Sequence, residues 1–188
     1  MAVASSMLEL GSPLPEFRLA DVADGSLRQA TDFQGRALVV AFICNHCPYV
    51  KRIASGLAQF SRDYADSDTS MVGIAANDPV AYPEDAPEEL ARTAQQLGYR
   101  FPTLFDEDQS VAQAFSAACT PDFFVYDQQR LLVYRGQFDG ARPSNDVAST
   151  GADLRAAVDA VLSDRPVPAD QRPSLGCSIK WKPGNEPS

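Results

Sequence analysis

The amino-acid sequence predicts an α/β protein with a mixed central sheet flanked by helices. Residues 37–43 and 71–76 are short apolar runs rich in β-branched side chains, as in buried strands. The periodic segment between them predicts a helix, and a crossover through a helix joins parallel strands. Farther along the chain, two apolar runs separated by residues 127–130 predict an antiparallel hairpin. The two patterns together predict parallel and antiparallel strands in one sheet.

The segment before the first buried strand predicts little regular structure. Residues 1–16 contain several Gly and Pro residues and are expected to form an irregular lead-in. Residues 17–29 hold two short apolar stretches around an Asp-Gly turn, which predicts an N-terminal hairpin. Thr31 or Asp32 is expected to cap one helical turn before the buried strand begins.

Four helices are expected after the first buried strand. Apolar side chains recur every three or four positions in residues 48–66, which begin with Pro, a residue favoured at helix starts. Residues 87–98 open with Pro-Glu-Glu and end at Gly, and a shorter helix is expected from Asp108. Thr150 and Asp153 resemble a capping pair and are expected to begin the last helix.

A Pro-rich, acidic loop over residues 77–87 follows the second buried strand. Loops usually run over the protein surface, so a surface excursion is the expected arrangement. Sites in open α/β sheets form at the carboxyl ends of the strands, where this loop emerges. The alternative is therefore that the loop overhangs the two cysteines at the end of the first buried strand.

These two cysteines, Cys44 and Cys47, lie between the first buried strand and the helix that begins at Pro48. Unpaired N–H groups and the positive end of the helix dipole favour a thiolate at such a position. We expect Cys44 to be the reactive sulfur, with a pKa below that of a free thiol. Cys47, one turn away, is expected to resolve a mixed disulfide formed on Cys44. The motif predicts thiol-disulfide exchange, which needs neither a metal nor an organic cofactor.

Two other interpretations of the cysteine pair remain open. Zinc sites normally need a second pair of Cys or His ligands at short spacing. His46 is the only histidine, and Cys119 and Cys177 are far apart in the sequence. A metal-binding protein that uses Cys44 and Cys47, with His46 as a further ligand, is therefore one alternative. A purely structural pair is the other.

Composition narrows the range of partners. The 188-residue chain has 16 basic and 25 acidic residues and a formal net charge of −9, which repels nucleic acid and anionic lipid. Its first residues lack the basic and apolar regions of a signal sequence, and no segment has the length of a membrane span. We expect a cytoplasmic protein that binds neither nucleic acid nor membrane. The sequence does not indicate its oligomeric state.

We expect one domain, residues 1–163, and a Pro-rich tail, residues 164–188, that docks on it. The tail has enough apolar surface to dock, because it contains Leu175, Ile179 and Trp181. Cys177 lies in this part of the tail, and Cys119 lies directly before a Thr-Pro pair. Both are candidate accessory thiols. A second redox pair between them is a hypothesis that requires Cα atoms within about 7 Å.

The order of elements and motifs resembles the thioredoxin fold over roughly residues 12–163. Within that superfamily the chain resembles the peroxiredoxin-like members of the redoxin (AhpC/TSA) group that carry a Cys-x-x-Cys. The segments that carry the resemblance are residues 42–50, 77–79, 119–123, 134–139 and 176–182. The resemblance implies exchange with disulfides or thiols of proteins or small molecules. It also implies a cis peptide bond at Pro121 and a substrate platform formed by Thr120 and Pro121, which Asn45 is expected to complete.

The residues around the cysteines differ from those of thioredoxins and peroxiredoxins. Thioredoxins have Trp and Gly-Pro where this chain has Ile43 and Asn45-His46. His46 resembles the His of disulfide isomerases, and a positive charge there stabilises the Cys44 thiolate and makes the couple more oxidising. Peroxiredoxins place a Thr three residues before the peroxidatic Cys, and neither Cys44 nor Cys47 has one there. A thiol peroxidase with antioxidant activity is therefore the alternative function.

Overall fold

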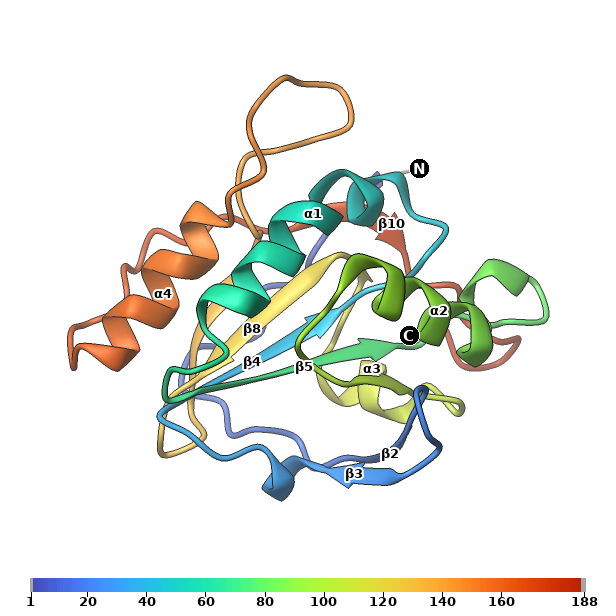
Figure 1. Cartoon of the computed structure of the whole chain (residues 1–188), viewed down its shortest axis with the longest axis horizontal. Helices are drawn as coiled ribbons and strands as arrows, with labels where there is room; N and C mark the ends of the chain where they lie inside the picture. Colours follow the sequence, from blue (N-terminus) through green and yellow to red (C-terminus); the bar gives the residue numbers. More distant parts are fainter. Residues whose placement is uncertain (1, 187–188) are drawn as a thin grey trace.

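The computed structural model describes residues 2–186 (Figure 1). Its strands are β1 (Ala2–Ala4), β2 (Arg18–Asp21), β3 (Leu27–Gln29), β4 (Ala37–Phe42), β5 (Thr69–Ala75), β6 (Thr103–Phe105), β7 (Cys119–Thr120), β8 (Asp122–Tyr126), β9 (Leu132–Gly136) and β10 (Leu175–Ser178). Its helices are α1 (Pro48–Asp63), α2 (Pro87–Leu97), α3 (Ser110–Ala114) and α4 (Ala152–Leu162), with short 3-10 helices η1 (Ala30–Asp32) and η2 (Pro83–Asp85). Each helix expected from the sequence is present, although some of the ends differ.

The central sheet has seven strands in the order β3-β2-β6-β5-β4-β8-β9. Strands β4, β5 and β6 are parallel, whereas β8 runs antiparallel to β4 and β9 runs antiparallel to β8. On the other side of the sheet, β2 is antiparallel to both β6 and β3. The predicted mixed sheet is therefore confirmed, with the N-terminal hairpin at one edge and the second hairpin at the other.

Strand β4 lies in the interior of the sheet, and all six of its residues are buried. Side chains alternate along a strand, so Val39 and Ala41 pack with residues of α1 and α4, whereas Val40 and Phe42 pack with residues of α3. Figure 1 shows α1 and α4 side by side on one face of the sheet and α3 on the other. Burial of β4 on both faces fixes the point at which the chain leaves the sheet and enters the cysteine motif.

Helix α1 begins at Pro48, as predicted, because the fixed φ of proline suits a first helical position and its missing N–H is not needed there. The helix ends earlier than the predicted residue 66, because Tyr64 has left the helical conformation, with φ −101° and ψ 2°. Helix α2 ends at Gly98, whose φ of 67° lies in the left-handed region that glycine adopts readily. Within residues 2–186 no helix has the length and apolar character needed to cross a membrane.

The predicted capping pair of the last helix is wrong. Helix α4 follows Gly151, which has a φ of 71° and no side chain to act as a cap. The N–H groups of Thr150 and Gly151 donate instead to Asp139 Oδ2, each at 2.7 Å. A carboxylate distant in sequence therefore organises the approach to α4, and the Thr150–Asp153 spacing is incidental.

The N-terminal segment is more regular than predicted. Strand β1 pairs antiparallel with β10, which supplies a partner that lies far away in the sequence. The short helix η1 begins at Ala30, so Thr31 lies inside it and is not its cap. Asp32 is its last residue and accepts the N–H of Gln29 at 2.9 Å. The predicted hairpin of β2 and β3 is confirmed.

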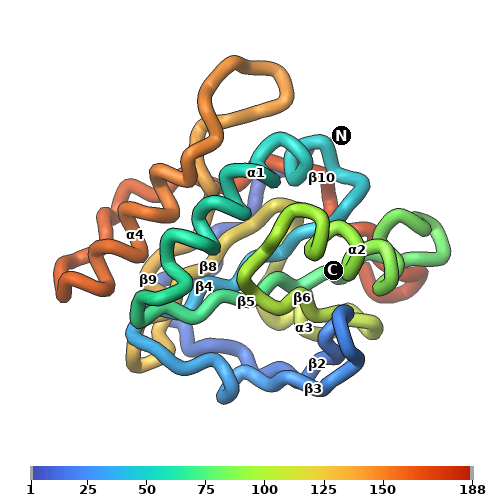
Figure 2. Tube along the Cα trace, in the orientation of Figure 1, coloured from blue at the N-terminus to red at the C-terminus, as the bar shows by residue number. Residues whose placement is uncertain are grey.

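The C-terminal tail returns to the middle of the molecule. Strand β10 pairs antiparallel with both β1 and β7 in a second, three-stranded sheet. The N-terminal segment and β10 lie next to each other in both Figure 1 and Figure 2. Ile179 is buried and Trp181 packs against the core on the α3 side, whereas Leu175 remains 41% exposed. Residues 175–178 of the tail thus pair with two other strands, while the docking of the whole tail and the division at residue 163 stay predictions.

Candidate active site

The Cys-x-x-Cys turn lies between the end of β4 and the start of α1. Cys47 is the N-cap residue of α1, with φ −72° and ψ 122°, and Cys44 lies in the turn before it. The two residues are 3% and 0% exposed. Both sulfurs are therefore largely shielded from bulk water.

Thr120 and Pro121 lie against the cysteine turn, and the peptide bond between them is cis, as the resemblance implied. The Thr120 hydroxyl oxygen is 3.0 Å from the Cys44 Sγ. When protonated, Cys47 donates to the carbonyl oxygen of Thr120 at 3.1 Å. Because β8 pairs with β4 immediately after this point, the Thr-Pro pair is held beside the turn that follows β4.

The two thiols shift each other's pKa. The neighbouring Cys44 lowers the pKa of Cys47 to about 5, with further lowering by the backbone N–H of Val50 in the first turn of α1. The neighbouring Cys47, burial and the Asp85 carboxylate raise the pKa of Cys44. These directions are opposite to the expected lowering of the Cys44 pKa. The lowered pKa falls on Cys47, because Cys44 lies beside it, whereas Cys44 is largely buried and lies near a carboxylate.

The loop after β5 contributes a buried carboxylate to the site. Asp85 is 0% exposed, and its Oδ1 accepts the N–H groups of Asn45 and His46 at 2.6 and 3.2 Å. Its Oδ2 accepts from Asn77 Nδ2 at 2.8 Å and lies 2.5 Å from His46 Nδ1. The Asn45 side chain donates to the carbonyl oxygen of Glu84 at 2.9 Å. The expected surface excursion is wrong at this point, because the loop overhangs the cysteine turn.

His46 is held between Asp85 and Tyr82. The His46 ring stacks on the Tyr82 ring, with 4.7 Å between centroids and 29° between planes. The His46 Nε2 atom is buried and has no hydrogen-bond partner within residues 2–186. The imidazole therefore has a fixed place beside the cysteine turn and is not a freely exposed side chain.

Cys44, His46 and Asp85 offer metal-ligand atoms that all lie within 4.8 Å of one another. This group contains Asp85 in place of Cys47, so it differs from the set expected from the sequence. Structural zinc sites use four ligands, and both oxygens of Asp85 already bond to nitrogen groups of the chain. The residues present therefore fit a metal ion poorly.

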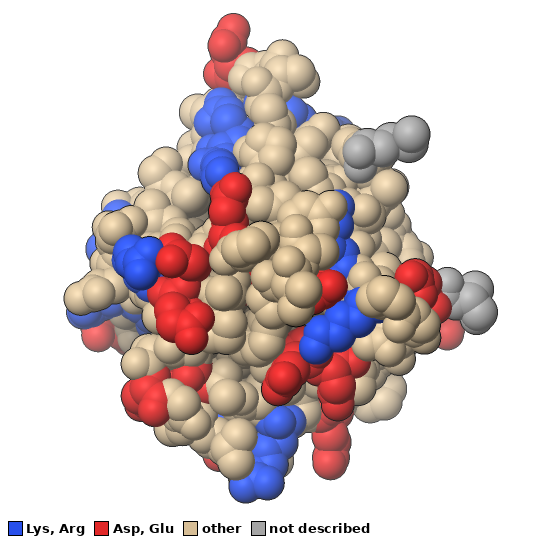
Figure 3. Space-filling model, turned by 90° about the vertical axis from the view of Figure 1, so that its right-hand side faces the viewer, with Lys and Arg blue, Asp and Glu red and all other residues tan. Residues whose placement is uncertain are grey.

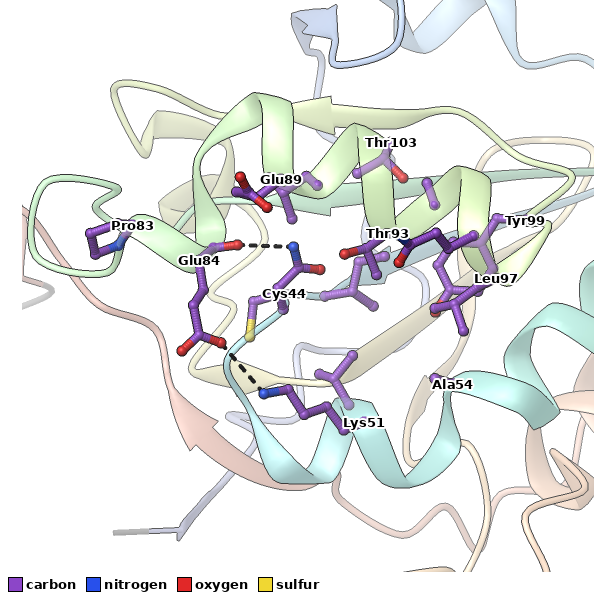
Figure 4. Close-up of a pocket in the computed structure, with 16 residues that line it drawn as sticks. Cys44, Lys51, Ala54, Pro83, Glu84, Glu89, Thr93, Leu97, Tyr99 and Thr103 are labelled. Carbon is purple, nitrogen blue, oxygen red and sulfur yellow. Dashed lines mark hydrogen bonds and ion pairs between the residues drawn. The ribbon is translucent and has the colours of Figure 1, made fainter.

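A pocket of about 630 Å³ lies beside Cys44, lined by residues of α1 and α2 (Figure 4). Cys44 lies toward the end where Lys51 and Glu84 form an ion pair of 3.4 Å, and Tyr99 lies at the far end. Cys47 does not line this pocket. A substrate that enters here therefore meets Cys44 and not Cys47.

The two candidate accessory thiols are placed differently. Cys177 lies opposite Thr120 in the pairing of β10 with β7, and burial and the neighbouring Cys47 raise the pKa of Cys177 to about 11. Cys119 lies opposite Ser178, and burial raises its pKa. Successive residues of a strand point to opposite faces, so this register disfavours a Cys119–Cys177 disulfide. It brings Cys177 toward the cysteine turn.

A second buried carboxyl group, Asp122, follows the Thr-Pro pair. Asp122 is 1% exposed, and burial raises its pKa to about 7. Its Oδ1 accepts the N–H of Phe123 at 3.1 Å, whereas Oδ2, near Ser174, has no hydrogen-bond partner in the part of the chain that the structure describes. The sequence analysis did not single out Asp85 or Asp122, because neither lies in a motif or periodic pattern that marks it as buried.

Comparisons with known proteins place this site in a wider group. The sequence pattern of the AhpC/TSA family matches residues 10–135. Protein FixW of Rhizobium leguminosarum is 28% identical over 141 residues, which cover 70% of this chain and 62% of that protein. The chain thus spans less than two thirds of the length of FixW.

Solved structures extend the similarity to nearly the whole chain. An uncharacterized conserved protein from Geobacillus kaustophilus is 49% identical with a TM-score of 0.96, and the match covers 98% of each chain. The hypothetical protein SMc02350 from Sinorhizobium meliloti 1021 is 49% identical with a TM-score of 0.94, covering 96% of this chain and 99% of that one. A thiol:disulfide interchange protein of the thioredoxin family from Chlorobium tepidum TLS is 21% identical with a TM-score of 0.63, covering 82% and 98%. The fold is therefore a thioredoxin-like α/β fold.

Proposed function

Since the chain belongs to the AhpC/TSA family, we propose that it is a thiol-disulfide oxidoreductase acting through Cys44 and Cys47. In this proposal Cys44 attacks the substrate disulfide and Cys47 resolves the mixed disulfide. Thr120, Pro121 and Asn45 form the substrate platform, and His46 tunes the couple. No metal or organic cofactor takes part. The chain then belongs with the peroxiredoxin-like members of the family that carry a Cys-x-x-Cys.

The observation that carries the proposal is the unequal access of the two thiols: Cys44 lines the pocket beside α2, whereas Cys47 is 0% exposed and lines no part of it. Cys44 loses its proton to solvent, and the Cys44 thiolate attacks one sulfur of the substrate disulfide. One substrate thiolate leaves with the electron pair. The Cys47 thiolate then attacks Cys44 Sγ, and the second substrate thiolate leaves. The products are a Cys44–Cys47 disulfide and two substrate thiolates, which take their protons from solvent.

The comparisons support the same class of reaction. A thiol:disulfide interchange protein is among the structural neighbours, although at 21% identity it speaks for the fold alone. We propose that the substrates are disulfides or thiols of proteins or of small molecules. On the face shown in Figure 3, acidic and basic side chains occur in small groups between uncharged areas, and the net charge is −9. Such a surface favours partners other than nucleic acid or anionic membranes, in keeping with the proposed cytoplasmic location.

The proposal is tested by the reduction of a disulfide substrate, with insulin and a small aromatic disulfide as two probes and dithiothreitol as reductant. We expect the wild type to accelerate both reactions and the Cys44→Ser variant to lose this activity. The Cys119→Ala variant is the matched control, since it removes a buried thiol of the adjoining strand and should retain activity. A Cys47→Ser variant should retain the substrate as a mixed disulfide on Cys44. Full activity of Cys44→Ser would contradict the assignment of roles.

One observation favours a peroxidase as the second candidate function. The Thr120 hydroxyl lies 3.0 Å from Cys44 Sγ, so the strand after α3 supplies a Thr hydroxyl that neither sequence register provided. A peroxide bound there would oxidise Cys44 to a sulfenic acid, which Cys47 would convert to the Cys44–Cys47 disulfide with release of water. Rapid consumption of hydrogen peroxide by wild type, lost in Thr120→Val but with disulfide reduction retained, would support this function.

A further inference from the structure

We propose that Cys177 is a third redox thiol, which accepts the disulfide from the Cys44–Cys47 pair by bonding to Cys47. The inference rests on the proposed function, because it concerns how the oxidised pair is returned to its reduced form. It assigns to the last strand of the chain a direct part in the chemistry. Cys177 would be the point at which an external reducing thiol reaches the protein.

The placement of Cys177 carries the inference. Strand β10 pairs Cys177 with Thr120, and side chains of directly opposed residues lie on the same face of a strand pair. Thr120 contacts both motif cysteines, with its hydroxyl 3.0 Å from Cys44 Sγ and its carbonyl oxygen 3.1 Å from Cys47 Sγ. Cys177 also packs against the buried cluster that contains Cys44 and Cys47. Three sulfurs therefore gather around one residue.

Gly176 permits this close approach. A Cβ atom at residue 176 would lie 2.0 Å from the carbonyl oxygen of Thr120 and 2.6 Å from its carbonyl carbon. Both atoms belong to the backbone beside the cis peptide bond, so they have little freedom to move. Only a residue without a side chain lets β10 lie this close to β7, with Cys177 opposite Thr120.

Access differs between the sulfurs in a way that suits a relay. Cys44 lines the pocket beside α2, Cys47 is 0% exposed and lines no part of it, and Cys177 is half-buried. A reducing thiol that cannot reach the fully buried Cys47 can reach Cys177. Substrate and reductant then meet different sulfurs, the substrate Cys44 and the reductant Cys177.

The transfer step is an isomerisation of disulfides without net oxidation. The Cys177 thiolate attacks Cys47 Sγ in the Cys44–Cys47 disulfide, a new Cys47–Cys177 bond forms, and the Cys44–Cys47 bond breaks. The electron pair of the broken bond stays on Cys44, which takes the proton that Cys177 lost. An external thiol then attacks Cys177 Sγ and releases the Cys47 thiolate, and a second external thiol completes the reduction with formation of the external disulfide.

Oxidation of the motif itself favours the reactive form of Cys177. Burial and the neighbouring Cys47 raise the pKa of Cys177 in the reduced protein, whereas Lys180 lowers it. When Cys47 enters a disulfide, it no longer carries a charge. The contribution of Cys47 to the raised pKa therefore disappears at the step at which Cys177 is needed.

Cys119 provides the matched control for this inference. It is a buried thiol in β7, directly next to Thr120, but it lies opposite Ser178 in the register. Its thiol points to Pro121 O, at 3.8 Å, with no hydrogen bond to Cys44 or Cys47 within residues 2–186. Removal of Cys119 should therefore leave the relay intact.

The experiment is a disulfide map of the full chain carrying Cys44→Ser, oxidised with glutathione disulfide and digested without reduction. We expect mass spectrometry to find the peptide of Cys47 linked to that of Cys177, both alone and when Cys119→Ala is added. Cys47 bonded only to glutathione with Cys177 free, or a Cys119–Cys177 link, would overturn the inference. As a second measurement on otherwise native protein, Cys177→Ala should slow the re-reduction of the Cys44–Cys47 disulfide by glutathione, whereas Cys119→Ala should not. An unchanged rate would also count against the relay.

These outcomes separate the relay from the proposed function. Absence of the Cys47–Cys177 link together with normal reduction of insulin by the wild type would overturn the relay alone. Failure of the wild type to reduce any disulfide probe would overturn the proposed function, and the disulfide map would still report on Cys177, because it needs no substrate turnover.

Discussion

Two buried carboxyl groups, Asp85 and Asp122, differ strongly in their hydrogen bonding. Asp85 comes from the loop before α2 and is 0% exposed, and both of its oxygens bond to nitrogen groups of three residues. Asp122 comes from the start of β8 and is 1% exposed, yet it accepts one backbone hydrogen bond and leaves Oδ2 without a partner in the described residues. Two carboxyl groups with nearly equal burial therefore differ in how completely their oxygens are hydrogen-bonded.

The difference shows how each buried carboxyl group is accommodated. A carboxyl group that accepts several N–H bonds has its solvation replaced by the protein, so Asp85 fixes the backbone around Asn45 and His46. An unsatisfied buried carboxyl group keeps its proton to a higher pH, and the pKa of Asp122 is raised by burial to about 7. The loop that contains Asp85 is thus held in place by hydrogen bonds, whereas the C-terminal tail near Asp122 is held by packing and strand pairing.

The largest expected effect is at Asp122. The pKa of Asp122 in the folded protein, about 7, is raised above the ordinary 3.8. The contribution of Asp122 to the free energy of unfolding is therefore fully present below pH 4 and is lost as the pH rises to about 7. The loss is on the order of 4 kcal/mol, because each pKa unit corresponds to about 1.4 kcal/mol. Asp122→Asn should therefore be more stable than wild type at pH 8, and it should lose less stability than wild type between pH 4 and 8, although the raised pKa of Asp106, about 6, still contributes a slope. Urea unfolding across this range checks it, and the exposed Asp146→Asn is the control. An unchanged pH slope in Asp122→Asn would refute the account.

Removal of the other carboxylate should destabilise the protein. Asp85→Ala leaves the N–H groups of Asn45 and His46 and the amide of Asn77 without their acceptor. Unsatisfied buried donors cost about 1–3 kcal/mol each, and partial access of water limits the total to about 4 kcal/mol. The urea midpoint should fall accordingly, whereas exposed Glu84→Ala should change it little. A stability equal to wild type would show that Asp85 does not hold this loop in place.

A methyl group added at residue 176 tests the packing of the C-terminal tail. Gly176→Ala places a Cβ 2.0 Å from Thr120 O, and displacement of β10 should cost about 3 kcal/mol. Gly140→Ala is the matched control, since its Cβ would meet only Val147 at an ordinary 3.8 Å. The variant should also expose Cys47, so its alkylation by iodoacetamide should become faster. If Gly176→Ala unfolds at the same urea concentration as wild type, the tail does not pack as described.

The smallest expected effect is a change in the redox potential of the Cys44–Cys47 pair. Its sign should differ between variants of Asp85 and His46, whose side chains bond to each other. The Asp85 carboxylate is one cause of the raised Cys44 pKa, so Asp85→Asn should stabilise the reduced form and make the couple more oxidising. The shift should be roughly 30 mV, equal to about 1.4 kcal/mol for two electrons. His46→Ala leaves the Asp85 charge without its imidazole partner and should shift the potential in the opposite direction. Equilibration with glutathione measures both, with Asp78→Asn as the control in the same loop. Shifts of the same sign would contradict this arrangement.

The sequence predicted the elements whose signal is local. The β4 run and the α1 periodicity depend on residues within one segment, and each was found close to the predicted position. The neighbourhood of the cysteines was also predicted in part, because the Thr-Pro pair and the Cys-x-x-Cys form a recognisable set. The secondary structure of a single segment, and the motif that it carries, can be inferred without a structure.

The features that the sequence did not predict depend on partners far away along the chain. Strand β1 exists because β10 pairs with it, and the approach to α4 depends on Asp139. Asp85 lies in a loop whose Pro-rich, acidic composition is typical of the surface, and its burial follows from donors in the cysteine turn and at the start of the loop itself. The location of the lowered pKa at Cys47 likewise required the positions of Cys44, Asp85 and Val50 in space. Burial and pairing of this kind are properties of the assembled fold.

The pairing of β10 with β7 also determines the order in which the site can be completed during synthesis. All residues of the cysteine turn, the loop with Asp85 and the Thr-Pro platform are made before residues 175–178, which supply β10. The domain can begin to collapse earlier, since folding during synthesis proceeds from the N-terminal side. Until β10 forms, the buried cluster that contains Cys47 lacks the packing of Cys177. The last strand of the chain therefore completes the cover of this cluster, and the site reaches its final form only when the chain is almost fully made.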